Sequence, residues 1–597
     1  MKGLDADLRA LQEVRDLVAR TKAAVKAVAG YGQADVDRLC AAMADAGAKA
    51  AHDLARMAVQ ETGFGRLHYK ILKNLFGSEG TWASIQHERT VGVLSSDPHT
   101  GITEVAAPVG VVAGVIPSTN PTSSALFKAI ISVKGRNGIV LSPHPSARRC
   151  ILQAAEVLRR AIERAGGPPD LVTCLEQPTL ESTGALMKHR DVAVILATGG
   201  SGLVRAAYSS GKPAYGVGPG NVPAYIDRSA NPREVAEHIV TSQSFDNGTL
   251  CCSEQGLVID APVYDKVLSA LAERGAHLCS ADEVRLLENL CNQGGHMNPK
   301  VVGQDPWKVA EMAGFHVARS TTVLLAPQAG VGPEHKLSIE ILCPLLSVHK
   351  VDGWQQGCEQ SIAMLKQGGL GHTLSIHCKN DEVLEAFFLQ KPASRIVVNG
   401  PSSQGAVGFS TNLMPSFSLG CSPLAGNITS DNITARHLIT IKRAAVPKAD
   451  WKALERRFHE RAAAMTGEAA PRGSGLPGDP GLRRLAPGSQ PEEHRPLAIV
   501  QPVAPAPRPQ PHAAMQPIAP TFTRPAQVDR PGSAPAPATP SVRPTIPVAA
   551  APSAKAGGFR LTPGEIQGIL EHAGSGCPMG PCSGCAHREP STGACRA

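Results

Sequence analysis

The stretch VGVVAGVI, residues 109–116, decides the fold class of this chain. It is short, rich in valine and almost wholly apolar, which is typical of a strand inside a parallel sheet that is covered on both faces. Similar runs recur at residues 138–141, 192–196 and 396–398, and helix patterns such as residues 147–165 separate them. Strands that alternate with helices in this way predict a doubly wound α/β fold.

Composition changes sharply toward the end of the 597-residue chain. Residues 471–560 contain 21 of its 49 prolines and almost no aliphatic runs. Such a segment cannot bury enough apolar surface to offset its conformational entropy, so a Pro/Ala-rich disordered linker is expected over residues 447–560. This composition excludes a single compact fold of the whole chain.

The net charge of +8 lies mostly in the same region. The first 446 residues carry 42 basic and 40 acidic side chains, so a broad basic surface for nucleic acid is not expected. No run reaches the ~18 apolar residues of a membrane span. Residues 1–28 have charges at helical spacing and no apolar signal core, which predicts an amphipathic helix rather than a leader. The 15 cysteines are irregularly spaced and are typical of free thiols in a reducing cytoplasm.

The strongest chemical signal is SFDNGTLCCSEQ, residues 244–255. Two adjacent cysteines follow a glycine-containing turn and precede the apolar run GLVID, residues 256–260. A single cysteine in such a setting is most often a buried core thiol, so the decision between core thiol and nucleophile depends on other motifs.

Five further motifs accompany this segment. They are IPSTNPTSSALFKAI (116–130), LSPHPSA (141–147), ATGGSGLVRAA (197–207), IEILCP (339–344) and GGLGHT (368–373). Together the six motifs resemble the CoA-acylating branch of the aldehyde dehydrogenase superfamily. That branch includes propionaldehyde and acetaldehyde dehydrogenases of bacterial microcompartments and the amino-terminal half of bifunctional aldehyde–alcohol dehydrogenases. The resemblance covers residue 10 to about residue 445 and implies two Rossmann-type domains plus an oligomerisation hairpin.

The resemblance and the composition together predict the domain boundaries. We expect an NAD-binding domain over residues 1–228, a catalytic thiol domain over residues 229–415 and a closing or oligomerisation segment over residues 416–446. A homo-oligomer is expected, with subunit contacts through residues 101–106 and 437–441. The linker, a helix over residues 561–574 and a cysteine-rich tail over residues 575–597 follow. No second enzyme-length domain is expected after Ala445, so alcohol formation would need a separate protein.

The resemblance implies three catalytic residues. Cys251 corresponds to the nucleophile and Asn120 to the residue that stabilises the oxyanion, and His372 is a candidate for orienting CoA or assisting thiol transfer. A thiolate adds to an aldehyde to form a thiohemiacetal, from which hydride can leave. Cys252 is expected to pack in the core, with a redox or resolving role as the alternative.

A dinucleotide site is implied in the same way. The expected cofactor-binding residues are Pro117, Ser142, His144, Thr198, Gly199, Gly200, Ser201 and Glu340. The Gly-rich turn that ends the run 192–196 and opens a helix can present backbone N–H groups to phosphate oxygens. Hydrolytic relatives carry a ribose-contacting lysine where this chain has Ser142-Pro143-His144, so NAD is expected and NADP stays open. No metal is assigned to the catalytic body.

An absence favours acyl transfer to coenzyme A. Hydrolytic aldehyde dehydrogenases carry a glutamate base in an E-L-G-G-K-like motif, whereas this chain has YGVGPGN at residues 215–221, with Gly216 at the corresponding place. Without that base the thiol of CoA is the better nucleophile for the thioester. The predicted reaction converts a short-chain aldehyde, acetaldehyde or propionaldehyde, with NAD and CoA to acyl-CoA and NADH. A hydrolytic NAD(P)-dependent enzyme is the alternative, and a scaffold with a degenerate site is the non-enzymatic one.

The segment LTPGEIQGILEHAG, residues 561–574, has the local signals of a short capped helix. Thr562, Pro563 and Glu565 stand at the N-cap, N1 and N3 positions of a capping box. A lone helix of ~14 residues is marginal in water, so docking on a partner is expected. The segment resembles encapsulation peptides, which implies shell-protein partners and a place in the lumen of a cytoplasmic microcompartment; a self-docking tail is the alternative.

The last residues hold a cluster of thiols. It consists of Cys577, Cys582, Cys585 and Cys595, with His587 among them. A zinc or iron–sulfur site and unbound thiols both stay open at this point, because the spacing matches no paired C-x-x-C pattern.

Overall fold

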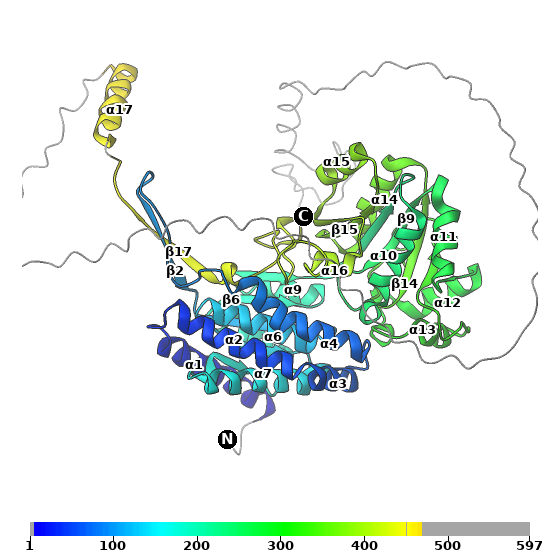
Figure 1. Ribbon diagram of the computed structural model, residues 1–597, viewed down its shortest axis with the longest axis horizontal. Coiled ribbons are helices and arrows are strands. Elements are labelled where there is room, and N and C mark those ends of the chain that lie inside the picture. The colour runs from blue at the N-terminus through cyan, green and yellow to red at the C-terminus, as the bar shows by residue number, and fades with distance from the viewer. Residues whose placement is uncertain (1–4, 449, 468–597) are drawn as a thin grey trace, which may run out of the picture. The chain divides into compact units, whose positions relative to one another are not determined.

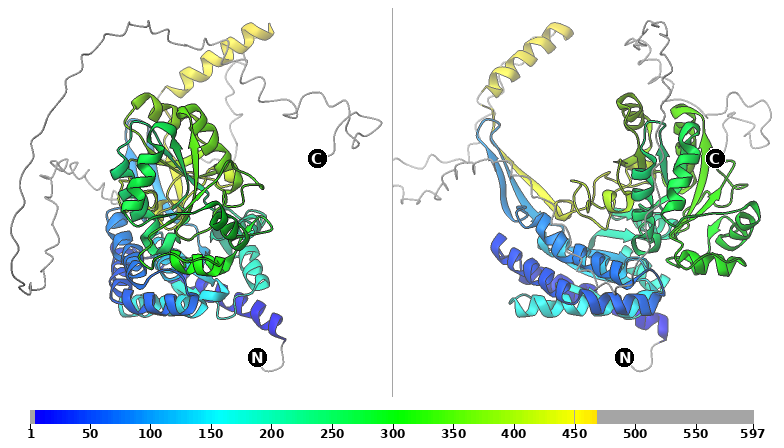
Figure 2. Two further views of the ribbon diagram at one scale, coloured as in Figure 1. Left: turned by 90° about the vertical axis from the view of Figure 1, so that its right-hand side faces the viewer. Right: turned by 45° about the vertical axis from the view of Figure 1, so that its right-hand side comes forward.

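The computed structural model describes residues 5–448 and 450–467, and Figures 1 and 2 show their arrangement. The predicted linker beyond residue 467, the helix at residues 561–574 and the cysteine-rich tail lie outside the described residues. Within the described part the chain builds two parallel sheets, a three-stranded antiparallel sheet and a two-stranded ribbon. The predicted doubly wound α/β class is therefore confirmed for this part.

The first sheet has five parallel strands in the order β5-β4-β3-β6-β7. They are β3 (Val111–Ile116), β4 (Gly138–Pro143), β5 (Val172–Cys174), β6 (Val192–Thr198) and β7 (Ala214–Val217). Three of these strands coincide with apolar runs recognised in the sequence. The chain order reverses between β3 and β6, and open parallel sheets bind ligands beyond the carboxyl ends of the strands at such a switch point.

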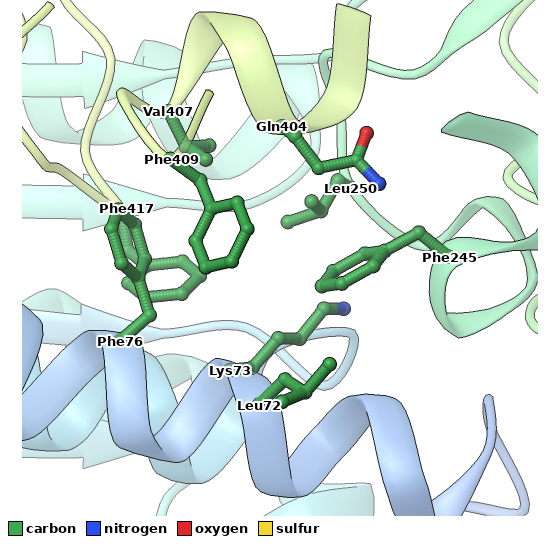
Figure 3. A pocket seen from close by; sticks show the side chains of 9 residues that line it. All are labelled: Leu72, Lys73, Phe76, Phe245, Leu250, Gln404, Val407, Phe409 and Phe417. Atoms are coloured by element: carbon green, nitrogen blue, oxygen red, sulfur yellow. The ribbon is translucent and has the colours of Figure 1, made fainter. Parts of the chain in front are cut away.

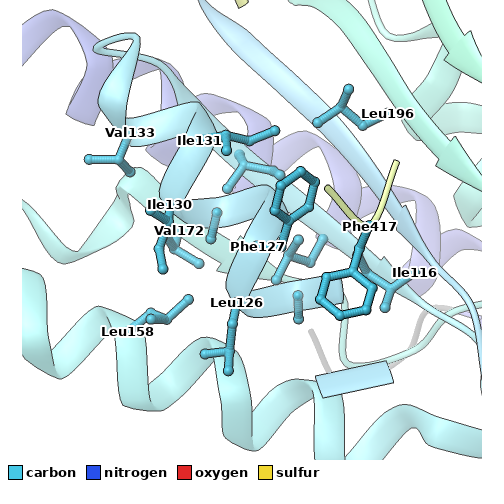
Figure 4. Close-up of a cluster of buried hydrophobic side chains, with 14 of the residues drawn as sticks. Ile116, Leu126, Phe127, Ile130, Ile131, Val133, Leu158, Val172, Leu196 and Phe417 are labelled. Atoms are coloured by element: carbon cyan, nitrogen blue, oxygen red, sulfur yellow. The ribbon is translucent and has the colours of Figure 1, made fainter. Parts of the chain in front are cut away.

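Helices cover both faces of the first sheet because alternate residues of each strand point to opposite sides. One face packs against α2 (Gln33–Lys49), α6 (Pro121–Lys134) and α7 (Arg148–Arg164), which lie side by side in Figure 1. Figure 4 shows part of this core, with Ile116 and Leu196 of the sheet close to Phe127 of α6. The other face packs against α1 (Ala6–Ala27), α8 (Leu180–Lys188) and α9 (Ser201–Tyr208). Burying one side chain such as Phe127 stabilises the fold by about 1.5–3 kcal/mol.

The second sheet has seven parallel strands in the order β10-β13-β14-β9-β8-β15-β16. They are β8 (Val222–Ile226), β9 (Glu254–Asp260), β10 (His277–Leu278), β13 (Leu324–Pro327), β14 (Leu345–Val351), β15 (Gly371–His377) and β16 (Ala393–Val398). The strand β8 pairs with β9 and β15, although the boundary predicted after residue 228 would assign it to the first domain. An apolar run such as VPAYI fits either parallel sheet, so its pattern alone does not tell which sheet it joins.

Helices surround the second sheet and lead into the loops of the site. They are α10 (Pro232–Ser244), α11 (Tyr264–Glu273), α12 (Ala281–Cys291), α13 (Pro306–Ala313), α14 (Gly353–Gly368), α15 (Asp381–Gln390) and α16 (Ser402–Ala406). Near the amino terminus, α3 (Ala51–Thr62), α4 (Leu67–Leu75), the π-helical turn η1 (Phe76–Gly80) and α5 (Thr81–Ile85) precede the first sheet. A two-stranded ribbon joins β11 (Asn292–Gln293) to β12 (His296–Met297). No helix among residues 5–448 and 450–467 combines the length and the apolar character that a membrane crossing needs.

The antiparallel sheet joins segments far apart in the chain. Its strands are β1 (Gly92–Asp97), β2 (Ile102–Pro108) and β17 (Ile439–Ala445), and β17 pairs with β2 along its whole length. Figure 2 shows the hairpin of β1 and β2 beside β17. The segments 101–106 and 437–441 thus meet in one sheet, while their predicted contact with a second subunit stays a prediction. The helix α17 (Trp451–Thr466) follows, so the disordered linker predicted over residues 447–560 is wrong for its first residues. This part of the range contains no proline between Trp451 and Thr466, and helix-forming residues such as alanine, glutamate and arginine dominate it.

Candidate active site

Cys251 lies in the loop that connects α10 to the amino end of β9. The loop begins with the turn η4 (Phe245–Gly248), in which Asp246 and Asn247 have positive φ angles of 51° and 53°. Few non-glycine residues adopt this left-handed conformation, so the surrounding contacts must hold it in place. The Cys251 side chain is partly exposed, whereas Cys252 beside it is fully buried. The loop therefore presents one of its two thiols and encloses the other.

Gly220, in the loop before β8, brings three predicted site residues together. A Cβ atom at this position would lie 1.9 Å from the carbonyl oxygen of Cys251 and 3.1 Å from Nδ1 of His372. The backbone N–H of Gly220 donates a hydrogen bond of 2.7 Å to Oε1 of Glu340. Cys251, His372 and Glu340 therefore converge on one glycine at the amino ends of β8, β9 and β15.

The electrostatic surroundings of the thiol come from its neighbours. The adjacent Cys252 and burial raise the pKa of Cys251 well above its ordinary value, and His372 acts in the opposite direction. Neither neighbour is a carboxylate. His372 is buried; Nδ1 lies 3.0 Å from Oγ1 of Thr373, and Nε2 has no hydrogen-bond partner among the described residues. A histidine beside a thiol of high pKa can accept a proton from that thiol or from an incoming one.

Cys252 is buried against α16. Its thiol donates to the carbonyl oxygen of Ser403 on α16 at 3.4 Å, and the hydroxyl of Ser402 donates to the Cys252 carbonyl at 2.8 Å. These contacts fit the packing role that the sequence favours for this cysteine.

Asn120 stands at the N-cap of α6, directly before Pro121. Its Oδ1 accepts a 2.6 Å hydrogen bond from Nζ of Lys73, and its Nδ2 lies 3.5 Å from the carbonyl oxygen of Thr249 in the cysteine loop. The amide N–H₂ group is therefore turned toward the loop that carries Cys251. This is the orientation that an oxyanion donor requires.

Sequence reasoning missed Gly220, Lys70, Lys73 and Asp246. The two lysines of α4 are buried and both bind Asp246 of the cysteine loop. The sequence does show two lysines three residues apart in the apolar segment YKILKNLF, and it shows Asp246 in the FDN motif. Nothing in the sequence indicates that these two segments are in contact. In the sequence, the GPGN segment that contains Gly220 stands out only because it lacks a carboxylate.

Gly216 does not point toward the thiol, as its predicted correspondence to the catalytic glutamate would require. A Cβ atom at residue 216 would lie 2.6 Å from Oη and 2.7 Å from Cζ of Tyr208, and equally close to Val204, both on α9. Gly216 therefore faces α9 and not the thiol, because side chains alternate along β7. The neighbours that act most strongly on the Cys251 thiol are Cys252 and His372, and neither of them is a carboxylate. This observation replaces the argument from Gly216.

An apolar cavity lies next to the cysteine loop, and Figure 3 shows the side chains that point into it. Its lining consists of Leu72, Lys73, Phe76, Phe245, Leu250, Gln404, Val407, Phe409 and Phe417. The volume is about 10 Å³, room for roughly one water molecule. Its lining residue Leu250 directly precedes Cys251 in the chain, and Phe409, which is 55% exposed, forms part of its rim.

The predicted dinucleotide residues lie at the carboxyl ends of three neighbouring strands. Pro117 follows β3, Ser142 and His144 stand at the end of β4, and the turn Thr198 to Ser201 connects β6 to α9. These positions surround the switch point between β3 and β6. Glu340 comes from a different place, the segment before β14, where burial raises its pKa to about 8.

The turn after β6 fits a phosphate group. Gly200 is the N-cap of α9, and a Cβ atom at Gly200 or Gly202 would meet nothing within 4 Å, so the amino end of the helix is open. Lys128, which is fully buried, donates from Nζ to Oγ1 of Thr198 at 2.9 Å and to the carbonyl oxygen of Leu196 at 3.0 Å. Helix amino ends with free backbone N–H groups bind phosphates, so this turn can hold the pyrophosphate of a dinucleotide.

Ser142 and His144 differ in their accessibility. The Ser142 hydroxyl is buried and lies 2.8 Å from Oγ1 of Thr183. The exposed His144 uses its Nδ1 to accept the backbone N–H of Ser146 at 3.2 Å. A ligand can therefore reach His144 more readily than the hydroxyl of Ser142.

Comparison with known proteins identifies relatives of this arrangement. The model of the aldehyde dehydrogenase family matches residues 6–294. The chain is 40% identical over 438 residues to the bifunctional aldehyde-alcohol dehydrogenase of Escherichia coli K12, covering 72% of this chain and 49% of that protein. It is 35% identical over 431 residues to the acetylating succinate-semialdehyde dehydrogenase of Clostridium kluyveri, covering 72% of this chain and 95% of that protein. The chain thus spans about half the length of the bifunctional relatives and nearly all of the second.

Solved structures agree with the sequence relatives. An acetylating aldehyde dehydrogenase from Geobacillus thermoglucosidasius is 47% identical with a TM-score of 0.73, and the match covers 74% of this chain and 98% of that one. A propionaldehyde dehydrogenase from the fucose-utilisation microcompartment of Clostridium phytofermentans is 26% identical with a TM-score of 0.66, over 72% and 97% of the chains. The propionaldehyde dehydrogenase of Rhodopseudomonas palustris, solved with CoA and an acylated cysteine, is 26% identical with a TM-score of 0.65, over 72% and 97%.

Proposed function

Because the chain belongs to the aldehyde dehydrogenase family, in its CoA-acylating branch, we propose that it oxidises a short-chain aldehyde with NAD and coenzyme A to acyl-CoA and NADH. The observation that carries this proposal is the convergence of Cys251, His372 and Glu340 on Gly220. This geometry joins a thiol, a neighbouring base and a candidate ribose ligand in one place.

Cys251 is the proposed nucleophile. Its sulfur attacks the aldehyde carbon, a C–S bond forms, and the carbonyl π electrons move to oxygen as an alkoxide. Nδ2 of Asn120, together with the backbone N–H of Cys251, stabilises that alkoxide. When bound, NAD would supply the acceptor for the hydride. Loss of the hydride converts the adduct on Cys251 into a thioester.

His372 is proposed to manage the proton of each thiol. The high pKa of the Cys251 thiol means that it is largely protonated at neutral pH, so it needs a base at the moment of attack. The imidazole of His372, which acts on the Cys251 thiol, suits that task. After it has released that proton to solvent, it can take the proton of the CoA thiol. CoA then attacks the thioester carbon, the acyl group moves to its sulfur, and Cys251 leaves as a thiolate.

Acyl transfer to CoA is proposed in preference to hydrolysis. The neighbours that act most strongly on the pKa of the Cys251 thiol are Cys252 and His372, and neither is a carboxylate that could hold an attacking water. A thiol is an intrinsically better nucleophile toward a thioester than neutral water. The name of the acetylating relatives supports the same outcome.

A small apolar aldehyde is the proposed substrate. The cavity beside the cysteine loop is lined mainly by apolar side chains, four of them phenylalanines, which favours a small apolar aldehyde such as acetaldehyde or propionaldehyde. Its one lining cation, Lys73, already binds Asp246 and Asn120. An anionic aldehyde, such as the semialdehyde named for the Clostridium kluyveri relative, would find no free partner for its charge in this cavity.

NADH formation from propanal, measured with and without CoA, tests the proposal. Sustained turnover is expected only with CoA, and the Cys251→Ala variant should show none. Turnover that continues without CoA and yields free acid would establish the hydrolytic alternative. Parallel assays with NAD and NADP decide the dinucleotide preference.

We also propose that the enzyme works inside a bacterial microcompartment and forms a homo-oligomer. The helix pattern of residues 561–574 and the microcompartment origin of one structural neighbour support the first proposal. The exposed sheet of β1, β2 and β17 supports the second. A fluorescent protein fused to residues 558–574 should form foci only in cells that make the shell, and an Ile566→Asp fusion is its matched control. Diffuse fluorescence of both fusions would contradict encapsulation, and a monomeric mass in solution would contradict oligomerisation.

A further inference from the structure

The helix α4 directs two lysines into the interior of the protein. Lys70 and Lys73 are each only 2% exposed and lie three residues apart, so they project from the same side of the helix. Charged groups removed from water are costly unless they are paired and hydrogen-bonded. The partners of both ammonium groups lie in the two loops of the proposed active site.

Asp246 of the cysteine loop binds both lysines. Its Oδ2 accepts from Nζ of Lys70 at 2.9 Å, from Nζ of Lys73 and from Oγ1 of Thr249 at 2.8 Å. Its Oδ1 accepts the backbone N–H of Arg66 at 2.8 Å. Burial works to raise the pKa of Asp246, but the two ammonium groups outweigh it and hold the pKa below its ordinary value. The carboxylate is therefore ionised and fixes the position of both lysines.

Lys73 alone reaches the side chain of Asn120. Its Nζ donates to Oδ1 of Asn120 at 2.6 Å and to Oγ1 of Thr249 at 2.9 Å. Lys70 donates instead to the backbone carbonyl of Thr119 at 3.0 Å. The two lysines thus share Asp246 but differ in what they do to the Asn120 amide.

An ammonium group imposes one orientation on a neighbouring amide. The two ends of an asparagine amide have nearly the same shape, so packing alone scarcely distinguishes them. Lys73 carries only donors while it is protonated, so it can pair with Oδ1 of Asn120 but not with the N–H₂ group. The N–H₂ group is therefore held on the opposite side, where it donates to Oγ1 of Thr119 at 3.2 Å and faces the carbonyl oxygen of Thr249, two residues before Cys251.

We propose that Lys73 is a positioning residue of the reaction: it locks the Asn120 amide with its N–H₂ group toward the site of the developing oxyanion. This inference rests on the proposed function. A donor aligned before the reaction stabilises the transition state without reorganising, whereas a freely turning amide must be oriented at that moment. The role requires Asn120, since the Nζ of Lys73 is already engaged by Asn120, Asp246 and Thr249.

A double-mutant cycle tests the coupling. Loss of one oxyanion donor commonly lowers kcat ~10²- to 10³-fold, and this is expected for Asn120→Ala. Lys73→Met keeps the Asn120 amide but no longer fixes its orientation. The expected fall in kcat is therefore between about 10-fold and 100-fold, which is part of the loss expected when the donor is missing, and KM for NAD should change little. In the Asn120→Ala background, Lys73→Met should change kcat less than about 3-fold, because residues that act through one another are not additive.

Lys70→Met is the matched control. It also removes one ammonium group from Asp246 and one buried positive charge, but it leaves the Lys73–Asn120 hydrogen bond in place. Its effect on kcat should be smaller and the same in both backgrounds. If Lys73→Met does not fold, as judged by its melting curve, Lys73→Gln carries the same cycle.

Two results would overturn the inference. One is an equal fold-loss from the Lys73 substitution with and without Asn120. The other is an equal loss from the Lys70 and Lys73 variants with an equal drop in Tm, which would indicate a purely structural role. The proposed function fails separately, since it predicts CoA-dependent turnover by the unmodified protein.

Discussion

Replacing Gly220 with alanine is expected to disable the active site while leaving the fold in place. Gly220 is not among the residues with positive φ, so its backbone conformation accepts an alanine, and only space is lacking. The new methyl group would lie 1.9 Å from the carbonyl oxygen of Cys251 and 3.1 Å from Nδ1 of His372. The substitution therefore acts on the nucleophile loop and the neighbouring base together.

The size of the effect follows from the distance. Cβ atoms essentially never approach another heavy atom closer than 3.0 Å, so the Cys251 backbone must move by about 1 Å. A misplacement of about 1 Å in a reacting group can lower the rate ~100-fold. This corresponds to about 2.7 kcal/mol of lost transition-state stabilisation in kcat/KM.

The assay compares Gly220→Ala with Gly218→Ala. Gly218 lies two residues earlier in the same loop, also without a positive φ, and a Cβ there would meet nothing within 4 Å. CoA-dependent NADH formation from propanal should fall ~100-fold in the first variant and stay within about 3-fold in the second. Melting curves and alkylation of Cys251 by iodoacetamide separate a displaced thiol from an unfolded protein.

One result would refute the reasoning. If Gly220→Ala keeps near-normal kcat/KM and an unchanged Tm, the Cys251 carbonyl does not pack against Gly220 in the working enzyme. The convergence of Cys251, His372 and Glu340 would then lose the contact on which it depends.

Three further outcomes are expected. Burial raises the pKa of Glu340 to about 8, so the Glu340 side chain is largely protonated at pH 7. Ribose hydroxyls donate hydrogen bonds to the ionised carboxylate. The Kd for NADH should therefore fall by up to ~10-fold per pH unit as the pH rises toward 8, and then level off. A fluorescence titration should show this dependence in the unmodified protein and not in Glu340→Gln, and a flat profile in both would exclude the ribose role. Phe409→Ala, which removes the exposed rim of the cavity, should raise kcat/KM for hexanal relative to propanal ~10-fold, and an unchanged ratio would place the aldehyde elsewhere. Cys252→Ala should keep CoA-dependent turnover within about 5-fold, since its thiol bonds to Ser403, whereas Cys251→Ala should abolish turnover; the reverse pattern would exchange their roles.

Local sequence patterns predicted much of the secondary structure. The runs at residues 109–116, 138–141 and 192–196 became β3, β4 and β6, and the helix pattern at 147–165 became α7. These elements are recognisable because parallel strands covered on both faces must be apolar throughout, and an amphipathic helix must repeat every 3.6 residues. The assignment of β8 to the second sheet was not recognisable, because the apolar pattern is the same in both sheets.

The residues of the proposed active site also fall into two groups: those that the sequence predicts and those that it does not. Cys251 and Asn120 could each be selected from one contiguous motif, residues 244–255 and residues 116–130. Gly220, Lys73 and Asp246 could not, because their importance comes from contacts between segments far apart: a glycine against the Cys251 carbonyl, and a lysine of α4 against Asn120 and Asp246. The Gly216 comparison failed for the related reason that the direction of a side chain on β7 depends on what packs beside that strand.

By itself, then, the amino-acid sequence determined the fold class, the order of the strands and helices along the chain, and the chemical identity of the thiol, the amide and the Gly-rich turn. The tertiary structure decided which of the two cysteines is partly exposed, which end of the Asn120 amide faces the loop that carries Cys251, and which side chains line the cavity beside that loop. The physical reason is that periodicity and turn chemistry act over a few residues, whereas burial, pKa and hydrogen-bond direction at the site are set by groups brought together only when the chain folds.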